Sequence, residues 1–145
     1  MTGLLYTTDA YLREFDAGVV AYVEGGVILD QTAFYPGGGG QPCDFGTLTA
    51  GESVWPVTAA RKVDGRVVHT IDGEMPAVGT SVTGHLDWDR RYKLMRTHTA
   101  MHILCGVVFR DYGAQVTGGN MDPLQGRMDF EFETMHQDLV AAIDA

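Results

Sequence analysis

Residues 87–92 read Asp-Trp-Asp-Arg-Arg-Tyr, and the character of the sequence changes at this stretch. Asp87 is a favoured N-cap residue, because its carboxylate accepts a hydrogen bond from a free N–H group of the first helical turn. Beyond it, side chains recur at helical rather than alternating spacing at Tyr92, Met95, Thr99, His102 and Val107. We therefore predict a helix from about Trp88 to Phe109 or Arg110, with Gly106 weakening its last turn.

The residues before Asp87 predict a module built of β-strands. Short runs rich in β-forming residues are separated by glycine-containing turns, a pattern typical of a small barrel or sandwich. Asp64-Gly65 predicts a tight hairpin turn, because both residues tolerate a positive φ. The predicted strands are Gly18–Val23, Gly26–Leu29, Gly46–Thr49, Trp55–Lys62, Arg66–Ile71 and Val82–Leu86.

Three further features follow the predicted helix. Gly118-Gly119 predicts a loop, the alternating run Met128–Glu133 predicts a strand with one buried face, and Gln137–Asp144 predicts the start of another helix. The expected fold class is therefore α+β. We divide the chain into a β-barrel module at residues 1–86 and the first part of an α+β domain at residues 87–145.

The composition is that of a globular protein. Apolar residues make up 45% and charged residues 20% of the 145 residues, which excludes an intrinsically disordered chain. No apolar run reaches the roughly 18 residues needed to cross a bilayer, and the amino terminus lacks a signal-peptide pattern. We expect a cytoplasmic protein with no membrane partner and, with only two cysteines, reduced thiols.

The net charge of −9 gives no overall attraction to nucleic acid, so any RNA contact must come from local positive patches. Seven of the ten Lys and Arg residues lie in two short segments, residues 61–66 and 90–96. These segments are candidate RNA-binding patches. The alternative for Arg90 and Arg91 is a solvated helix face.

The candidate metal ligands are His98 and His102. Residues four apart on a helix lie one above the other, with roughly 5–6 Å between their Cβ atoms, so two imidazoles can face one ion. Zinc prefers four ligands, so the pair is half of a site, and the alternative is two helix histidines with ordinary hydrogen-bond partners. Cys105 lies too far along the helix axis and is interpreted as a buried small residue. No spacing argues for His136, and the remaining candidates are interpreted as structural: Cys43, His69 and His85.

The most unusual stretch is the glycine run Gly37-Gly38-Gly39-Gly40. Glycine permits positive φ and close approach of a ligand, so the N–H groups of the run can face an anionic or carbonyl oxygen. No Gly-Lys-Ser/Thr follows, which excludes a phosphate-binding P-loop. Pro36 and Pro42 stiffen the ends of the run, and polar Thr32 and Gln41 flank it, which favours a binding pocket over a flexible barrel turn.

Residues 32–46 and 96–104 together resemble the editing domain of alanyl-tRNA synthetases, and more closely the free-standing alanyl-tRNA editing proteins of the AlaX type. The first stretch reads Thr-Ala-Phe-Tyr-Pro-Gly-Gly-Gly-Gly-Gln-Pro-Cys-Asp-Phe-Gly, and the second reads Arg-Thr-His-Thr-Ala-Met-His-Ile-Leu. The resemblance covers most of the chain. It implies a β-barrel module followed by an α+β editing domain shared with threonyl-tRNA synthetases.

The resemblance also implies a zinc ion held by the HxxxH histidines and by a downstream CxxxH pair. His98 and His102 match the first two ligands, but no cysteine follows Cys105, so the second pair is absent from this sequence. We therefore interpret the chain as a fragment or a shortened relative of a longer editing protein. A missing carboxy-terminal segment, or a second copy through self-association, is an expected partner.

The implied activity is zinc-associated hydrolysis of an aminoacyl-tRNA ester, with the acceptor end of tRNA(Ala) as partner and Ser-tRNA(Ala) as substrate. Thr32 and Gln41 match pocket positions and are the candidate catalytic residues. A Thr32 hydrogen bond to the substrate hydroxyl would favour serine over alanine, and Gln41 would orient the ester or a water. Gly37, Gly38, Gly39, Gly40 and Arg96 are the candidate substrate-binding residues.

Alternatives remain open at this stage. Thr32 is alternatively an ordinary strand residue. Zinc chemistry offers three roles, polarising the ester carbonyl, generating hydroxide or holding the substrate, and the sequence does not choose among them. The alternatives to an enzyme are a non-catalytic RNA-binding module and an assembly fragment.

Overall fold

The computed structural model describes residues 2–132 and 141–143. The chain forms two compact units, the first from residues 1–38 and 42–92 and the second from residues 39–41 and 93–145. The division falls inside helix α1 (Trp88–Tyr112), so a domain boundary between residues 86 and 87 stays a prediction. The predicted helix at Gln137–Asp144 lies largely outside the described residues.

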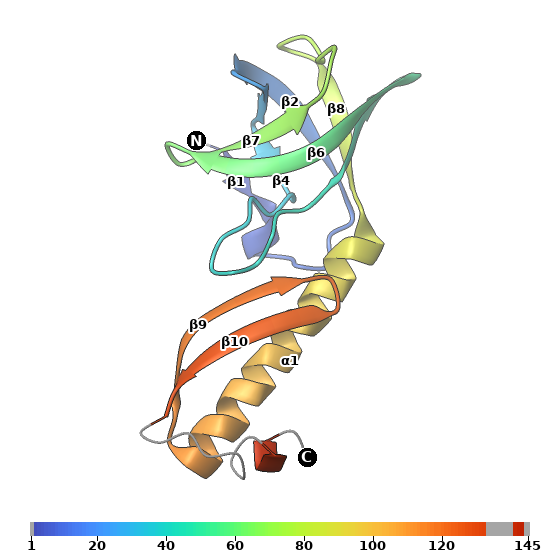
Figure 1. The fold of residues 1–145 in the computed structure, drawn as a ribbon. Helices are drawn as coiled ribbons and strands as arrows, with labels where there is room; N and C mark the ends of the chain where they lie inside the picture. Colours follow the sequence, from blue (N-terminus) through green and yellow to red (C-terminus); the bar gives the residue numbers. More distant parts are fainter. Residues whose placement is uncertain (1, 133–140, 144–145) are drawn as a thin grey trace. The chain divides into compact units, whose positions relative to one another are not determined.

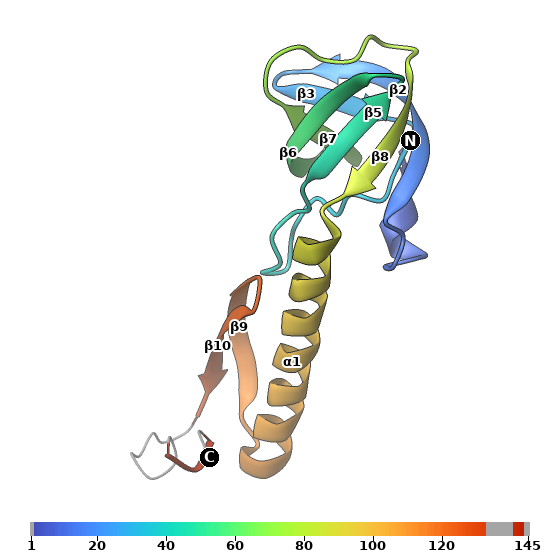
Figure 2. The same ribbon diagram turned by 90° about the vertical axis from the view of Figure 1, so that its right-hand side faces the viewer.

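A closed antiparallel barrel makes up most of the first unit (Figures 1 and 2). Neighbouring strands follow the order β2 (Glu14–Val23), β3 (Gly26–Leu29), β7 (Arg66–Ile71), β6 (Ser53–Val63), β5 (Gly46–Ala50) and β8 (Ser81–Leu86). Each strand predicted before Asp87 lies within one of these. Outside the barrel, β1 (Gly3–Leu4) pairs in parallel with β4 (Gln31–Thr32), and η1 (Leu5–Thr7) follows β1.

The barrel core follows from alternation along its strands. In β8 every second residue, Val82, Gly84 and Leu86, is buried, as expected for a strand with one face inside. Fully buried apolar side chains such as Phe34 and Leu48 fill the interior. The α+β class with a small amino-terminal barrel is therefore confirmed. So is the Asp64-Gly65 turn, whose φ angles of 47° and 77° are both positive.

A buried ion pair joins the start of α1 to the segment that follows the glycine run. The Arg91 guanidinium donates to both carboxylate oxygens of Asp44 and to the carbonyls of Ala10 and Ala33, at 2.9 and 2.7 Å. The backbone N–H of Tyr35 also donates to Asp44, at 2.7 Å. Arg91 is only 3% exposed, so both interpretations of this residue, an RNA-binding patch and a solvated helix face, are wrong.

Helix α1 begins and ends as its terminal residues dictate. Asp87 is the N-cap, as predicted, and its Oδ1 accepts a hydrogen bond from Arg90 N at 3.1 Å. The helix continues past the predicted end to Tyr112. It stops where Gly113 adopts a positive φ of 67° and donates its N–H to the Phe109 carbonyl at 2.9 Å, a common helix C-terminal arrangement.

The second unit consists of the remaining turns of α1 and an antiparallel hairpin of β9 (Gln115–Asp122) and β10 (Gln125–Glu131). The predicted loop at Gly118-Gly119 is wrong, because both residues lie inside β9. A Cβ atom on Gly119 would lie 3.3 Å from Met101, and one on Gly126 in β10 would lie 3.0 Å from the same side chain. Because these glycines have no side chain, the strands can pack close to the helix, and the glycines do not interrupt the strands.

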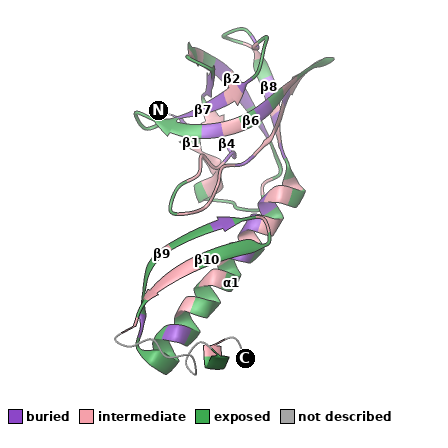
Figure 3. Ribbon diagram, in the orientation of Figure 1, coloured by how far each residue is buried: buried purple, intermediate pink, exposed green. Residues whose placement is uncertain are grey.

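Two further predictions for the second unit are corrected. The strand predicted at Met128–Glu133 is observed only from Met128 to Glu131, as the second half of β10, and Glu133 lies outside the described residues. Met128, Asp129 and Phe130 are all half-buried, and a register shift between Asp129 and Phe130 interrupts the alternation. The predicted helical spacing in α1 is correct, but the residues from which it was inferred do not form the buried face of the helix. Figure 3 shows the alternation of buried and exposed positions along α1. Leu94, Thr97 and Val108 are buried, whereas Tyr92, Thr99, His102 and Val107 are exposed.

In the described part of the chain, no helix has the length and apolar character to cross a membrane.

Candidate functional site

The two predicted metal ligands lie together on α1. The imidazole rings of His98 and His102 are stacked, with centroids 4.8 Å apart and planes 18° from parallel. Their Nε2 atoms face each other at 3.0 Å. Two nitrogens at this separation can both lie about 2.0–2.1 Å from one point between them, which is the zinc–nitrogen distance. The geometry therefore suits two positions of a zinc site.

Gln41 sets the orientation of His98. The Gln41 side-chain oxygen lies 2.8 Å from His98 Nδ1 and accepts its proton in a hydrogen bond. With the proton on Nδ1, the Nε2 lone pair of His98 is directed toward His102. Such an outer partner is typical of metal-binding histidines. Gln41 was predicted to be a catalytic residue, but its contact with His98 was not predicted, because 57 residues separate the two side chains along the chain.

Gly40, in the second half of the glycine run, approaches β9 of the same unit. Gly37, Gly38, Gly39 and Gly40 all have positive φ, at 79°, 132°, 60° and 84°. The Gly40 carbonyl accepts a hydrogen bond from Met121 N at 3.0 Å, and a Cβ atom on Gly40 would lie only 2.5 Å from the Gly119 carbonyl oxygen. The run thus needs glycine both for its backbone conformation and for this close approach. Its role in substrate binding stays a prediction.

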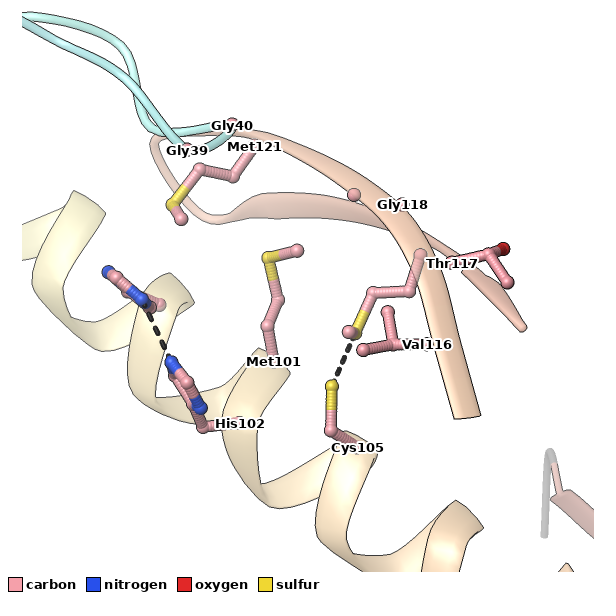
Figure 4. Close-up of a pocket in the computed structure, with 12 residues that line it drawn as sticks. Gly39, Gly40, Met101, His102, Cys105, Val116, Thr117, Gly118 and Met121 are labelled. Atoms are coloured by element: carbon pink, nitrogen blue, oxygen red, sulfur yellow. Dashed lines mark hydrogen bonds between the residues drawn. The ribbon is translucent and has the colours of Figure 1, made fainter. Parts of the chain in front are cut away.

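A cavity of about 330 Å³ lies between α1 and β9 and is bordered by Gly39 and Gly40 (Figure 4). His98 and His102 line one part of it, and sulfur-containing side chains line another. Figure 4 shows Met101 and Cys105 projecting from the helix toward the strands. The cavity is open to solvent at the histidine end, where His102 is exposed.

Only two ligand positions of a zinc site are present in residues 2–132 and 141–143, where no group of three His, Cys, Asp or Glu side chains is suitably placed. Cys105 is half-buried, and its thiol faces Met128 Sδ at 3.9 Å rather than the histidines. This arrangement agrees with its interpretation as a packing residue. His136 lies outside the described residues.

Thr32 is enclosed in the first unit. It is fully buried, its hydroxyl lies 2.7 Å from His69 Nε2, and Phe34 N donates to it at 3.1 Å. His69 Nδ1 donates in turn to the Val27 carbonyl at 3.2 Å. This network favours the alternative interpretation of Thr32 as a strand residue of the barrel, and a role in choosing the amino acid stays a prediction.

The other candidates occupy varied positions. Arg96 is exposed and lines a second cavity of about 420 Å³ with Leu104 and Phe130. His85, in β8, pairs with Glu14 at 3.0 Å, and Cys43 is half-buried and packs against the barrel core. These observations agree with the structural interpretation of His85 and Cys43 and leave the substrate role of Arg96 a prediction.

Comparison with known proteins places the chain in a family. The model of the family described as tRNA synthetases class II (A) matches residues 7–90. The chain belongs to the class II (A) tRNA synthetase family. Within this family, the alanyl-tRNA editing protein AlaX-M of Saccharolobus solfataricus is 44% identical over 137 residues, which cover 92% of this chain and 58% of the relative.

Further relatives of this class II (A) chain extend the comparison. AlaX-M of Methanosarcina barkeri is 41% identical over 148 residues, covering 97% of this chain and 61% of the relative. The alanine–tRNA ligase of Ignicoccus hospitalis is 41% identical over 131 residues, covering 89% of this chain and 14% of the ligase. The resemblance inferred from the two motifs is therefore confirmed. The chain spans about three fifths of the length of these AlaX-M relatives.

Proposed function

We propose that this chain takes part in editing of tRNA(Ala), as a hydrolase that cleaves the ester between a wrongly attached amino acid and the terminal ribose. Relatives named as alanyl-tRNA editing proteins and alanine–tRNA ligases support this proposal. The observation that carries it is the Gln41–His98 hydrogen bond, because it joins the glycine-run motif to the HxxxH motif within one unit. We further propose Ser-tRNA(Ala) as the substrate.

His98 and His102 are the residues of this chain that would hold zinc, each through Nε2. Bound zinc supplies a Lewis acid that can stabilise charge on an ester oxygen or on water. Gln41 keeps the proton of His98 on Nδ1 and thereby keeps Nε2 available. Gly39 and Gly40 border the same cavity, and we propose that backbone N–H groups of this segment orient a carbonyl oxygen of the substrate.

A deacylation assay tests the activity. We expect zinc-reconstituted chain to release serine from Ser-tRNA(Ala) faster than buffer does, and His98→Ala to abolish most of this difference. The matched control is His85→Ala, which removes a half-buried barrel histidine and should leave the rate unchanged. Equal hydrolysis by wild type and His98→Ala would refute the zinc-associated mechanism.

The alternative is a non-catalytic RNA-binding or assembly module, which is favoured by the presence of only two ligand positions among the described residues. Metal analysis separates the two functions. An editing hydrolase should retain close to one equivalent of zinc after dialysis. Retention below about a tenth of an equivalent, as expected of an open two-ligand site, together with RNA binding, would favour the alternative.

A further inference from the structure

An aromatic cluster covers part of the first unit, where the start of α1 meets the segment before β2. Tyr11, Arg13, Trp88 and Tyr92 form it, and all four belong to this unit. The Trp88 ring stacks on Tyr92 with centroids 5.9 Å apart and planes 27° from parallel, and it lies 5.8 Å from the Tyr11 ring. The Arg13 guanidinium lies over Trp88 at 4.4 Å.

The two tyrosines that border the cluster are open to solvent. Tyr11 is 64% exposed and Tyr92 is 44% exposed, whereas Trp88 between them is half-buried. Exposed aromatic rings held by neighbouring rings lose little conformational freedom when another flat ring stacks on them. The cluster therefore presents solvent-exposed aromatic rings on which planar groups can stack.

Arg13 adds hydrogen-bond donors at the edge of the cluster. Its side chain is exposed, and no hydrogen bond or ion pair of its guanidinium is found with the described residues. Four carboxylates lie nearby in sequence, and each is already engaged: Asp9 accepts from Tyr11 N, Glu14 pairs with His85, Asp87 caps α1, and Asp89 has a contact of its own. Their negative charge limits the cluster to few phosphate contacts.

We propose that this aromatic cluster is a stacking surface for unpaired bases of single-stranded RNA, with Arg13 contacting one phosphate. Bases stack on exposed aromatic rings without sequence preference, and arginine on an aromatic face adds a charged contact. The inference rests on the proposed function, since the unpaired 3′ end of tRNA is the single strand that an editing hydrolase must hold. Binding dominated by stacking explains how an acidic chain holds RNA.

Fluorescence of Trp88 tests the proposal directly. The chain has two tryptophans, and Trp55→Phe leaves Trp88 as the single reporter. We expect an uncharged RNA hairpin with an unpaired ACCA end to change the Trp88 emission saturably, and a blunt hairpin of the same stem to bind at least about fivefold more weakly. The logarithm of affinity should fall with the logarithm of salt concentration with a slope of only about −0.7, as for one phosphate on a single strand.

Variants separate stacking from folding. Tyr11→Ala and Tyr92→Ala should each weaken binding of the ACCA hairpin at least about fivefold, whereas Tyr11→Phe and Tyr92→Phe should preserve it. The matched control is Tyr22→Ala, which removes a tyrosine that is 51% exposed on β2 and whose hydroxyl donates to the Pro76 carbonyl at 3.1 Å. Equal binding of the blunt and ACCA hairpins, or no effect of either alanine variant, would overturn the proposal.

Two outcomes keep this proposal distinct from the proposed function. If the ACCA hairpin binds through the tyrosines but the chain cleaves no ester, the stacking surface stands and the hydrolase proposal fails. If the alanine variants abolish self-association of the chain and leave RNA affinity unchanged, the cluster is a protein contact and the stacking proposal fails.

Discussion

His69 lies fully buried inside the barrel, and two hydrogen bonds hold its imidazole in one tautomer. Nδ1 donates to the Val27 carbonyl and Nε2 accepts from the Thr32 hydroxyl. Burial lowers the pKa of His69 from 6.5 to about 4, and the hydrogen bond to Val27 opposes this shift only in part. The imidazole is therefore neutral in the folded protein at pH 7.

The depressed pKa of His69 makes stability depend on pH. Between pH 6.5 and about 4 the unfolded chain binds a proton that the folded chain does not, so the free energy of unfolding falls as pH falls through this window. The contribution lost amounts to about 3 kcal/mol and levels off below the folded pKa. We expect urea unfolding of His69→Gln to show a pH dependence weaker by about one proton in this window; identical slopes for the two proteins would contradict the assignment.

Gln41 provides a second prediction for a single residue. Gln41→Ala removes the acceptor of the His98 Nδ1 proton, and loss of such an outer partner weakens zinc affinity or activity by about 10–100-fold. Competition with a chromophoric chelator measures the affinity without reference to activity. Gln125→Ala, an exposed glutamine at the start of β10, is the matched control and should bind zinc as wild type does.

At the scale of structural elements, Gly40 of the glycine run packs closely against β9. Gly40 faces the backbone of Gly119, whereas a Cβ atom on neighbouring Gly39 would meet nothing within 4 Å. Both residues have positive φ, so substitution strains both, but only Gly40 adds a backbone clash. Comparing the same substitution at Gly39 and at Gly40 therefore separates the cost of a positive φ from the cost of the close approach to β9.

We expect Gly39→Ala to lower the free energy of unfolding by about 1 kcal/mol, the cost of a left-handed non-glycine residue. Gly40→Ala should cost clearly more, because the loop or β9 must move and the Met121–Gly40 hydrogen bond is lost. Chemical unfolding of both variants measures the difference. Equal stabilities of the two variants would show that the close approach of Gly40 to β9 does not contribute to the free energy of unfolding.

The Asp44–Arg91 pair affects the stability of the whole first unit. Arg91 in α1 donates hydrogen bonds to three separate segments of the chain, at Ala10, Ala33 and Asp44. Both side chains are buried, so removing one leaves an unpaired charge inside the protein. We expect Arg91→Ala to lower the free energy of unfolding by about 3–5 kcal/mol.

Arg66→Ala, an exposed arginine of β7, is the control for this prediction and should change stability by no more than about 0.5 kcal/mol. A denaturation midpoint of Arg91→Ala within error of that of Arg66→Ala would refute the structural role of the pair. Asp44→Asn provides an independent check, since it keeps the shape of the side chain but removes its charge.

Local patterns in the sequence determined the barrel strands, α1 and the family of this protein. Alternation, turn residues and the Asp87 cap depend only on neighbouring residues, so the barrel strands, the Asp64-Gly65 turn and α1 were predictable. The two motifs were likewise sufficient for the family. The HxxxH pair was predictable as a geometric unit, because one helical turn brings His98 and His102 together whatever surrounds them.

Only the tertiary structure decided which partners these residues have. The contacts of Gln41 with His98 and of Arg91 with Asp44 join residues 57 and 47 positions apart, and no local pattern specifies them. Burial of Thr32 against His69, the packed face of α1, and the glycines of β9 and β10 depend on which surfaces meet in space. The physical reason is that hydrogen bonding and close packing are properties of neighbours in space, whereas the sequence shows directly only neighbours along the chain.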